Sequence, residues 1–249
     1  MRTFAERDIV ESVREALQFI SCFHPVDFIR HLAQTYEAEE PGPARDAIGQ
    51  ILLNSRMSAL DRRPMCQDTG TVNVFVKLGI GARIDSMRSL QAMIDEATRL
   101  AYTDPANPLR ASVVADPLFL RPNTRDNTPA VVHTEIVEGD RIDVAVAAKG
   151  GGSENKAKFA VLNPSDSVAD WVVETAATLG AGWCPPGVFG IGVGGTAEKA
   201  VLLAKQALMD DIDMYELLER GPQNKLEELR IELYEKVNAL GIGAQGLGG

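Results

Sequence analysis

The sequence predicts a mixed α/β fold, in which an N-terminal helical region is followed by strands and helices that share one core. Apolar residues recur every three or four positions in the first sixty residues, which is typical of amphipathic helices. Alternating β-branched residues follow in the middle of the chain, and helical spacing returns towards its end. With 249 residues, 45% of them hydrophobic, the chain can bury a sizeable core. No repeat or low-complexity linker marks a domain boundary.

Three helices are expected in the N-terminal region. Helical spacing runs from Thr3 to Gln34, and a second helix within this stretch starts at Pro25, whose fixed φ suits a first helical turn. A third helix is expected from Ala44 to Leu60. The apolar positions that predict the first helix are Ile9, Val13, Leu17 and Ile20.

The middle of the chain predicts a strand, a helix and a long loop. The strand runs from Thr71 to Val76 and starts directly after residues 65–70. Helical spacing follows from Ser86 to Ala101. The next thirty residues are rich in Pro, Asn, Asp and Arg, which favours a loop with short strands. A long ordered loop of this kind is a candidate for a functional site.

Two further strands are predicted at Ala130 to Val137 and Arg141 to Ala148. They are joined by Glu138, Gly139 and Asp140, and the glycine favours a tight hairpin turn. Helical patterns then return at Ser167 to Leu179, Thr196 to Met209 and Asn224 to Leu240. The closing GIGAQGLGG is a poor end for a domain because glycines neither pack nor cap a helix, so we expect the sequence to be truncated.

The charge and hydropathy patterns exclude several classes of protein. Thirty-five acidic and 25 basic residues give a net charge of −10. This charge repels phosphate backbones, so nonspecific binding to nucleic acid or to anionic lipid is not expected. No stretch of 18 uncharged apolar residues is present, and the N-terminus lacks the layout of a secretory signal. We therefore expect a cytoplasmic protein without a membrane anchor.

The three cysteines are too few and too distant for a disulfide framework, so we expect reduced thiols. Cys66 lies in RRPMCQDTG and Cys184 lies in GWCPPG. Proline restrains the backbone of both segments and glycine allows a turn, which suits a thiolate held near a ligand. A buried structural thiol is the alternative for Cys66, and a turn with an incidental cysteine is the alternative for Cys184. Cys22 has no such neighbours, and we expect it to pack in the core. Without a C-x2-C pair, spacing alone gives only weak support to a metal site.

Two glycine-rich turns and one arginine could bind an anion. Lys149 and the glycines Gly150, Gly151 and Gly152 follow a predicted strand and could present N–H groups and a positive charge. Residues 192–196 precede a helix whose N-terminus could hold a carboxylate. Arg110 offers a rigid fork suited to a carboxylate, although a solvated surface charge is its default role. Neither glycine turn matches a nucleotide-binding motif.

A cysteine nucleophile would need a histidine base. The candidates are His24, His31 and His133, and none of them completes a triad in the sequence. Packing or surface roles are expected for all three.

Several strings together resemble the class I, iron–sulfur fumarate hydratases and their tartrate dehydratase relatives. They are RPMCQDTGTVNVFVKLG, NPLRASVV, NTPAVVHTEIV, AAKGGGSENK, CPPGVFGIGVGGTAEKA and LGIGAQGLGG. The resemblance spans nearly the whole chain and implies that residues 1–249 are the N-terminal, α-subunit-type domain of such an enzyme. The C-terminal catalytic portion would then be absent.

The resemblance implies an oxygen-sensitive 4Fe-4S cluster held by three cysteines, with one iron open to substrate. Cys66 and Cys184 match the first two ligands. The third ligand is expected beyond the end of this sequence, and Cys22 is not expected to replace it. In this reading Asp68 handles the proton of the hydroxyl group or water, and Gln67 hydrogen-bonds the substrate. Arg110, Lys149, Gly150, Gly151 and Gly152 receive a carboxylate.

The expected function is therefore the reversible hydration of fumarate to S-malate, a reaction of the tricarboxylic acid cycle. The resemblance implies that the base for the C3 proton and further arginines come from the C-terminal portion or a β-subunit, in a homodimer or an α2β2 assembly. The isolated chain is expected to be inactive. The alternatives are dehydration of tartrate, a non-catalytic module that binds an anion or a partner, and, more remotely, a cysteine hydrolase.

Overall fold

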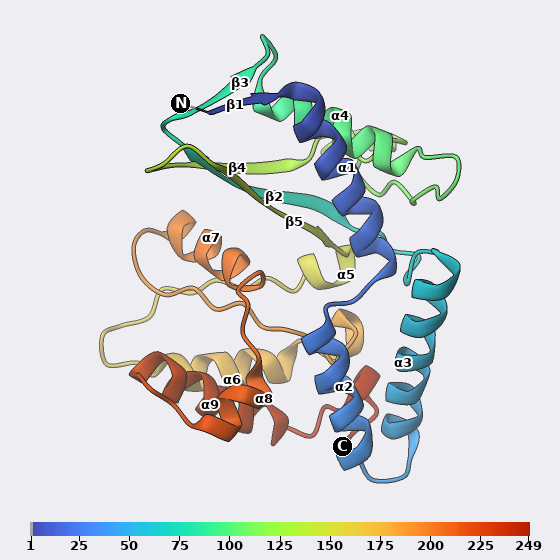
Figure 1. Cartoon of the computed structure of the whole chain (residues 1–249). Helices are drawn as coiled ribbons and strands as arrows, with labels where there is room; N and C mark the ends of the chain where they lie inside the picture. The colour runs from blue at the N-terminus through green and yellow to red at the C-terminus, as the bar shows by residue number, and fades with distance from the viewer. Residues whose placement is uncertain (1) are drawn as a thin grey trace. The chain divides into compact units, whose positions relative to one another are not determined.

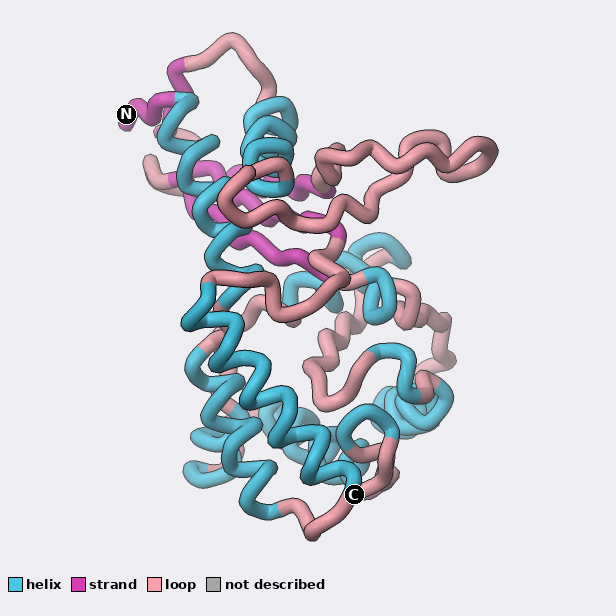
Figure 2. Tube along the Cα trace, turned by 90° about the vertical axis from the view of Figure 1, so that its right-hand side faces the viewer, coloured by secondary structure: helices cyan, strands magenta, loops and turns pink. Residues whose placement is uncertain are grey.

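A computed structural model describes residues 2–249, and the chain divides into two compact units. The first unit contains the chain up to His24 together with Ser55–Gly151, and the second contains Pro25–Asn54 and Gly152–Gly249. The five strands that the structure describes all lie in the first unit, whereas the second is described as helices and loops (Figure 2). The predicted mixed α/β class is confirmed.

The first unit is organised around a three-stranded mixed sheet. The central strand β2 (Thr71–Gly79) pairs in parallel with β4 (Val131–Val137) and antiparallel with β5 (Ile142–Lys149), as Figure 1 shows. A second, two-stranded parallel sheet is formed by β1 (Arg2–Ala5) and β3 (Ala82–Asp85). Because β5 pairs along nearly all of β2, its last residue lies beside the first residue of β2.

The predicted hairpin between the second and third strands of the sheet is wrong. β4 and β5 are joined by the expected short turn, but β2 lies between them, so the turn crosses the end of β2. The N–H of Gly79 donates to the carbonyl of Arg141 at 2.8 Å, and the N–H of Gly81 donates to that of Gly139 at 2.8 Å. A Cβ at Gly79 would lie 2.8 Å from the Arg141 oxygen, so glycine is what allows this crossing. Local turn chemistry cannot reveal that a third strand is inserted.

Two helices cover one face of this sheet. They are α1 (Glu6–Cys22) and α4 (Leu90–Tyr102). Alternate residues of β2 point towards them, namely Val72, Val74 and Val76, which are at most 1% exposed. Helix α4 begins four residues after the predicted start at Ser86, because the Ser89 hydroxyl caps it by accepting a hydrogen bond from the Ala92 N–H at 3.2 Å. This packing fixes the ends of β2 and α4, where the candidate site is built.

The second unit is formed by helices around two buried clusters. Helix α2 (Val26–Ala38) and helix α3 (Pro43–Asp61), whose last turns belong to the first unit, contribute Leu32 and Ile48 to one cluster, which also contains Ala244. The other cluster joins α6 (Val168–Thr178) and α9 (Lys225–Asn238). The remaining short elements are α5 (Gly151–Glu154), η1 (Ala181–Trp183), α7 (Ala197–Ala207), α8 (Met214–Arg220) and η2 (Ala244–Gly246).

Most of the expected helices and strands are present within a few residues of their predicted bounds. The short elements β1, β3, α5, α8, η1 and η2 were not expected. The buried residues described here form three clusters, whereas the sequence predicted a single core. None of the helices described in residues 2–249 is long and apolar enough to span a membrane.

Candidate active site

The loop that leads into β2 carries three of the predicted site residues. Cys66 and Gln67 are exposed, and Asp68 is half-buried. The backbone N–H of Asp68 donates to the sulfur of Cys66 at 3.4 Å. The loop therefore presents the thiol at the surface and orients it through its own backbone.

The carboxylate of Asp68 is fixed by two backbone N–H groups. Its Oδ2 accepts a hydrogen bond from Gly151 at 2.7 Å, and its Oδ1 accepts one from Gly70 at 3.2 Å. A Cβ on Gly150 would lie 3.1 Å from Oδ2, so the glycine turn fits closely around this carboxylate. Sequence analysis expected the turn to receive a carboxylate of the substrate, and in the structure one of its N–H groups holds the carboxylate of Asp68.

Arg110 and Lys149 belong to the same unit as Asp68. Arg110 is exposed, and its backbone carbonyl accepts a hydrogen bond from the Thr69 hydroxyl at 2.6 Å. Lys149 is the last residue of β5, is half-buried, and lies opposite Thr71 in the sheet. The structure thus brings Asp68, Gly150 and Gly151 together and ties the backbone of Arg110 to the residue after Asp68.

Sequence analysis missed two buried polar residues behind this loop. Tyr102 is 2% exposed and donates its hydroxyl to the carbonyls of Thr69 at 2.6 Å and Gly70 at 3.1 Å. Burial raises the pKa of Tyr102 to about 12. Asn127 is fully buried and donates to the Gly70 carbonyl at 2.9 Å.

Both residues carried a weak signal in the sequence. Tyr102 follows the apolar face of a predicted helix and adds a polar tip to it. Asn127 has a φ of +63°, a conformation that asparagine adopts more readily than most residues, and it lies in a stretch dense in turn-forming side chains. Neither signal specifies the partner that the side chain would bind.

Cys184 lies in the second unit on a loop with an unusual backbone. The thiol is exposed, and the residue has a left-handed conformation with φ +58°. Its N–H donates to the Ala181 carbonyl at 2.9 Å, and the bond between the following residues Pro185 and Pro186 is cis. The preceding Trp183 packs against Phe189 with ring centroids 5.0 Å apart. These contacts hold the backbone on both sides of the thiol, and the rigidity expected of this segment stays a prediction.

The closing segment holds the Cys184 loop. Gln245 donates two hydrogen bonds to the Pro185 carbonyl, from its backbone N–H at 2.7 Å and from Nε2 at 2.9 Å. The expectation that this glycine-rich segment cannot pack is wrong, because Ala244 is 4% exposed and belongs to a buried cluster. Gly152 also belongs to this unit, and a Cβ on it would lie 2.9 Å from the Gly182 carbonyl oxygen.

Comparison with known proteins decides the family. The family model described as fumarate hydratase (Fumerase) matches residues 10–249. The chain belongs to this fumarate hydratase family. It is similar to "Putative L(+)-tartrate dehydratase subunit alpha" of Methanocaldococcus jannaschii, with 36% identity over 97% of this chain and 83% of that protein. It is also similar to "L(+)-tartrate dehydratase subunit alpha" of Escherichia coli K12, with 32% identity over 98% of this chain and 80% of that protein.

Family membership makes this α-subunit-type chain a component of a hydro-lyase. The remaining candidates from its sequence contact neighbouring side chains. Cys22 is 2% exposed and lies 3.3 Å from the Ser21 hydroxyl. The three histidines contact Ser55, Tyr215 and Phe75, respectively. Burial lowers the pKa of His24 and of His31. Within residues 2–249, no group of three or more His, Cys, Asp or Glu side chains could hold a metal ion.

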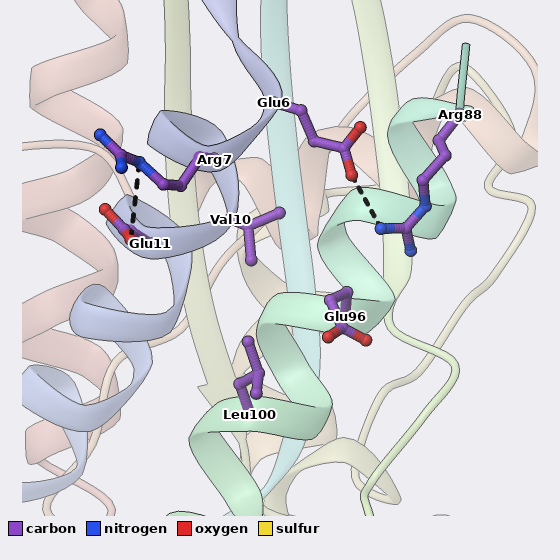
Figure 3. A pocket seen from close by; sticks show the side chains of 7 residues that line it. All are labelled: Glu6, Arg7, Val10, Glu11, Arg88, Glu96 and Leu100. Carbon is purple, nitrogen blue, oxygen red and sulfur yellow. Dashed lines mark hydrogen bonds and ion pairs between the residues drawn. The ribbon is translucent and has the colours of Figure 1, made fainter. Parts of the chain in front are cut away.

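The chain also has a hollow of about 450 Å³ between α1 and α4 (Figure 3). None of the predicted site residues lines this hollow. Four of its charged side chains pair with one another, Arg88 with Glu6 at 2.8 Å and Arg7 with Glu11 at 3.8 Å, and the fifth, Glu96, pairs with Arg99 at 2.6 Å. A hydrogen bond from Ser86 holds the pKa of Glu6 below its ordinary value. Because its charges are already paired, the hollow is a poor candidate for a second anion site.

Proposed function

We propose that this chain is the α-type component of an iron–sulfur hydro-lyase that reversibly hydrates fumarate to S-malate. The observation that carries the proposal is the Asp68 carboxylate, fixed by Gly70 and Gly151 two residues after the exposed thiol of Cys66. A carboxylate in a fixed orientation suits the transfer of a proton to or from a hydroxyl group. The family establishes the hydro-lyase class, and we propose the reaction and the roles of the residues.

The cysteines of this chain fit an iron–sulfur cluster by the chemistry of their donor atoms. Thiolates are the ligands of such clusters, and Cys66 and Cys184 are both free and exposed, whereas Cys22 is buried. A backbone N–H donates to the sulfur of Cys66. Such hydrogen bonds are typical of the sulfurs that bind iron–sulfur clusters, because they tune the reduction potential of the cluster. We propose that Cys66 and Cys184 supply two of three cysteine ligands. When bound, a cluster with one iron not held by cysteine would supply a Lewis acid.

Residues of the first unit would bind the substrate and transfer the proton. Arg110 would bind one carboxylate of the substrate through its fork of N–H groups, and Lys149 and Gly150 would add positive charge and backbone N–H groups. Gln67 would hydrogen-bond the substrate. Gly151 would act indirectly, by holding Asp68 in position. Gly152, which belongs to the second unit, is a further candidate for binding a carboxylate of the substrate.

Hydration of fumarate adds a hydroxyl group to one alkene carbon and a proton to the other. Asp68 would accept the proton that water loses as its oxygen bonds to carbon, and in the reverse direction it would return that proton to the leaving hydroxyl. The proton at the second carbon requires another group. The relatives are named α subunits, which supports a β-type partner, and we propose that this partner supplies that group.

The direct test is anaerobic reconstitution of this chain with and without its β-type partner, followed by measurement of fumarate absorbance. Turnover only with the partner and with iron and sulfide bound is expected. Full turnover by the chain alone would contradict the proposed division of roles, and no turnover by the loaded complex would contradict the reaction.

Dehydration of L(+)-tartrate is the second candidate, because two similar proteins carry that name at 36% and 32% identity. Loss of water from tartrate gives oxaloacetate, so the same proton and carboxylate contacts would serve both reactions. The loaded complex should be offered fumarate, S-malate and L(+)-tartrate in competition. A kcat/KM for tartrate above that for malate would assign the enzyme to tartrate.

The ligand assignment predicts a difference among the three cysteines. Cys66→Ser and Cys184→Ser should each abolish binding of iron and sulfide to the anaerobic complex, since serine is a poor ligand for iron–sulfur clusters. Cys22→Ser should keep the cluster, because this buried sulfur packs against protein. Iron and sulfide analysis is the measurement, and equal losses in all three variants would contradict the assignment.

A further inference from the structure

We infer that Tyr102 and Asn127 are positioning residues that set the spacing between Arg110 and the loop carrying Gln67 and Asp68. The inference rests on the proposed function and deepens it. Neither side chain is placed to touch the substrate, since both are at most 2% exposed. Both act on the backbone of the two segments that carry the proposed chemistry.

Asn127 joins these two segments directly. Its Nδ2 donates to the carbonyl of Gly70 at 2.9 Å, two residues after Asp68. Its Oδ1 accepts from the N–H groups of Ser112 at 2.7 Å and Val113 at 3.2 Å, just after Arg110. One rigid planar amide thus spans both segments, with its donor on one and its acceptor on the other.

Tyr102 fixes the same point from helix α4. Its hydroxyl donates to the carbonyls of Thr69 and Gly70, so the Gly70 carbonyl receives hydrogen bonds from both residues. On the other side, Gly70 abuts β5: a Cβ on it would lie 2.7 Å from the carbonyl carbon of Ala148. The Gly70 peptide is therefore held on two sides, and the Asp68 carboxylate that its N–H contacts is held with it.

Thr69 closes the connection. Its hydroxyl donates to the Arg110 carbonyl at 2.6 Å, while its own carbonyl receives the Tyr102 hydroxyl. A shift of the loop at Thr69 is thereby transmitted to Arg110. A misplacement of about 1 Å at a reacting group can cost about 100-fold in rate, so this spacing matters for catalysis.

Burial alone does not explain the choice of residues. A buried polar group costs free energy unless its hydrogen bonds are made, and an apolar side chain could fill either space without that cost. The side-chain hydrogen bonds of Tyr102 and Asn127 described above go to the segments 69–70 and 112–113, and the two side chains also hydrogen-bond each other. The two side chains thus form one connected network whose contacts with the backbone lie on these two segments, which points to control of the segments rather than to general packing.

The experiment compares Tyr102→Phe and Asn127→Gly with the wild type in the loaded complex. Phenylalanine keeps the ring of Tyr102, and glycine tolerates the positive φ of Asn127. With rates expressed per loaded cluster, kcat should fall at least about tenfold while KM changes less than about threefold, because Arg110 is still present but misaligned. Tyr36→Phe is the matched control; Tyr36 lies in the second unit beneath Arg45, and its substitution should leave both constants unchanged.

A double-variant cycle separates positioning from stability. In an Arg110→Lys background, Tyr102→Phe should cost less than about threefold in kcat/KM, since the group that it positions has been changed. A purely structural role would give the same fold-loss in both backgrounds, and that result would overturn the inference.

Hydrogen exchange provides a readout that does not depend on activity. In the complex, Asn127→Gly should speed exchange at the amides of Ser112 and Val113, and both variants should speed exchange at Gly70. Unchanged exchange at these amides would overturn the inference even if activity fell. A wild-type complex that is inactive on every dicarboxylate would overturn the proposed function, and it would also overturn the role of the two residues in that reaction. Faster exchange in the variants would in that case still show that Tyr102 and Asn127 hold these segments.

Discussion

At the scale of single residues, the carboxylate of Asp68 is oriented by the backbone N–H groups of Gly70 and Gly151. Replacement by asparagine keeps the shape of the side chain but removes a proton acceptor. Asp68→Asn should therefore lower kcat by about 100-fold or more in the loaded complex while iron content is unchanged. Asp143→Asn, at an exposed position of β5, is the control and should retain full activity.

His24 predicts how stability depends on pH. Burial lowers the pKa of His24 from its ordinary value of 6.5, so the folded state binds this proton less readily than the unfolded state. The stability that His24 contributes by being neutral in the folded state is therefore fully present above pH 6.5 and is lost as the pH falls below this value. Between about pH 7.5 and about pH 5.5, the thermal unfolding midpoint should fall less for His24→Gln than for the wild type. An identical fall would show that His24 does not contribute.

The residues proposed to carry the chemistry stand out in the sequence more readily than the residues that hold them in position. Cysteines between prolines and glycines stand out by type and neighbours, and Cys184 has a left-handed backbone conformation. Tyr102 and Asn127 were not found, because their partners are carbonyl and N–H groups of distant segments. Such partners have no signature in the sequence.

At the scale of elements, the glycine at the end of β2 determines how the sheet closes. Gly79→Ala places a methyl group 2.8 Å from backbone atoms of Gly139 and Arg141, which cannot move aside independently. We expect a loss of about 1–3 kcal/mol in the free energy of unfolding, measured by urea denaturation. Gly42→Ala is the control, since no atom lies within 4 Å of the added Cβ. Equal stability of both variants would contradict the close crossing.

Element positions followed from periodicity, but strand order did not. Helices α1, α4 and α6 were predicted because their apolar faces repeat along the chain, and α4 and α6 also begin at serine caps. The partner of a strand is set by long-range packing, so a short turn was taken for a hairpin although β2 separates β4 from β5. The short strands β1 and β3 are too brief to give a periodic signal.

At the scale of the whole chain, the first unit is interrupted by the excursion of residues 25–54 into the second unit. The ends of this excursion lie together, because the His24 Nδ1 and the Ser55 hydroxyl are 3.0 Å apart. No composition change marks the boundaries at residues 24 and 54, since helices α1, α2 and α3 lie on both sides of them. This is why sequence analysis predicted one core.

A chain made of residues 1–24 and 55–151, joined by a flexible linker of about three residues, should fold as the first unit alone. It keeps the sheet, α1, α4 and the buried cluster between them. A single cooperative thermal transition with slow exchange at the β2 amides is the expected result. A chain without a cooperative transition would show that this unit depends on the rest of the protein.

The crowding around Gly70 limits where this protein can be redesigned. A side chain at this position would clash with the backbone of Ala148 and Lys149. The carbonyl of Gly70 already accepts hydrogen bonds from Tyr102 and Asn127. A mutagenesis library intended to change which hydroxy acid is accepted should therefore leave Gly70 untouched. Diversity is better placed at Gln67 and Arg110, whose exposed side chains can vary without disturbing that junction.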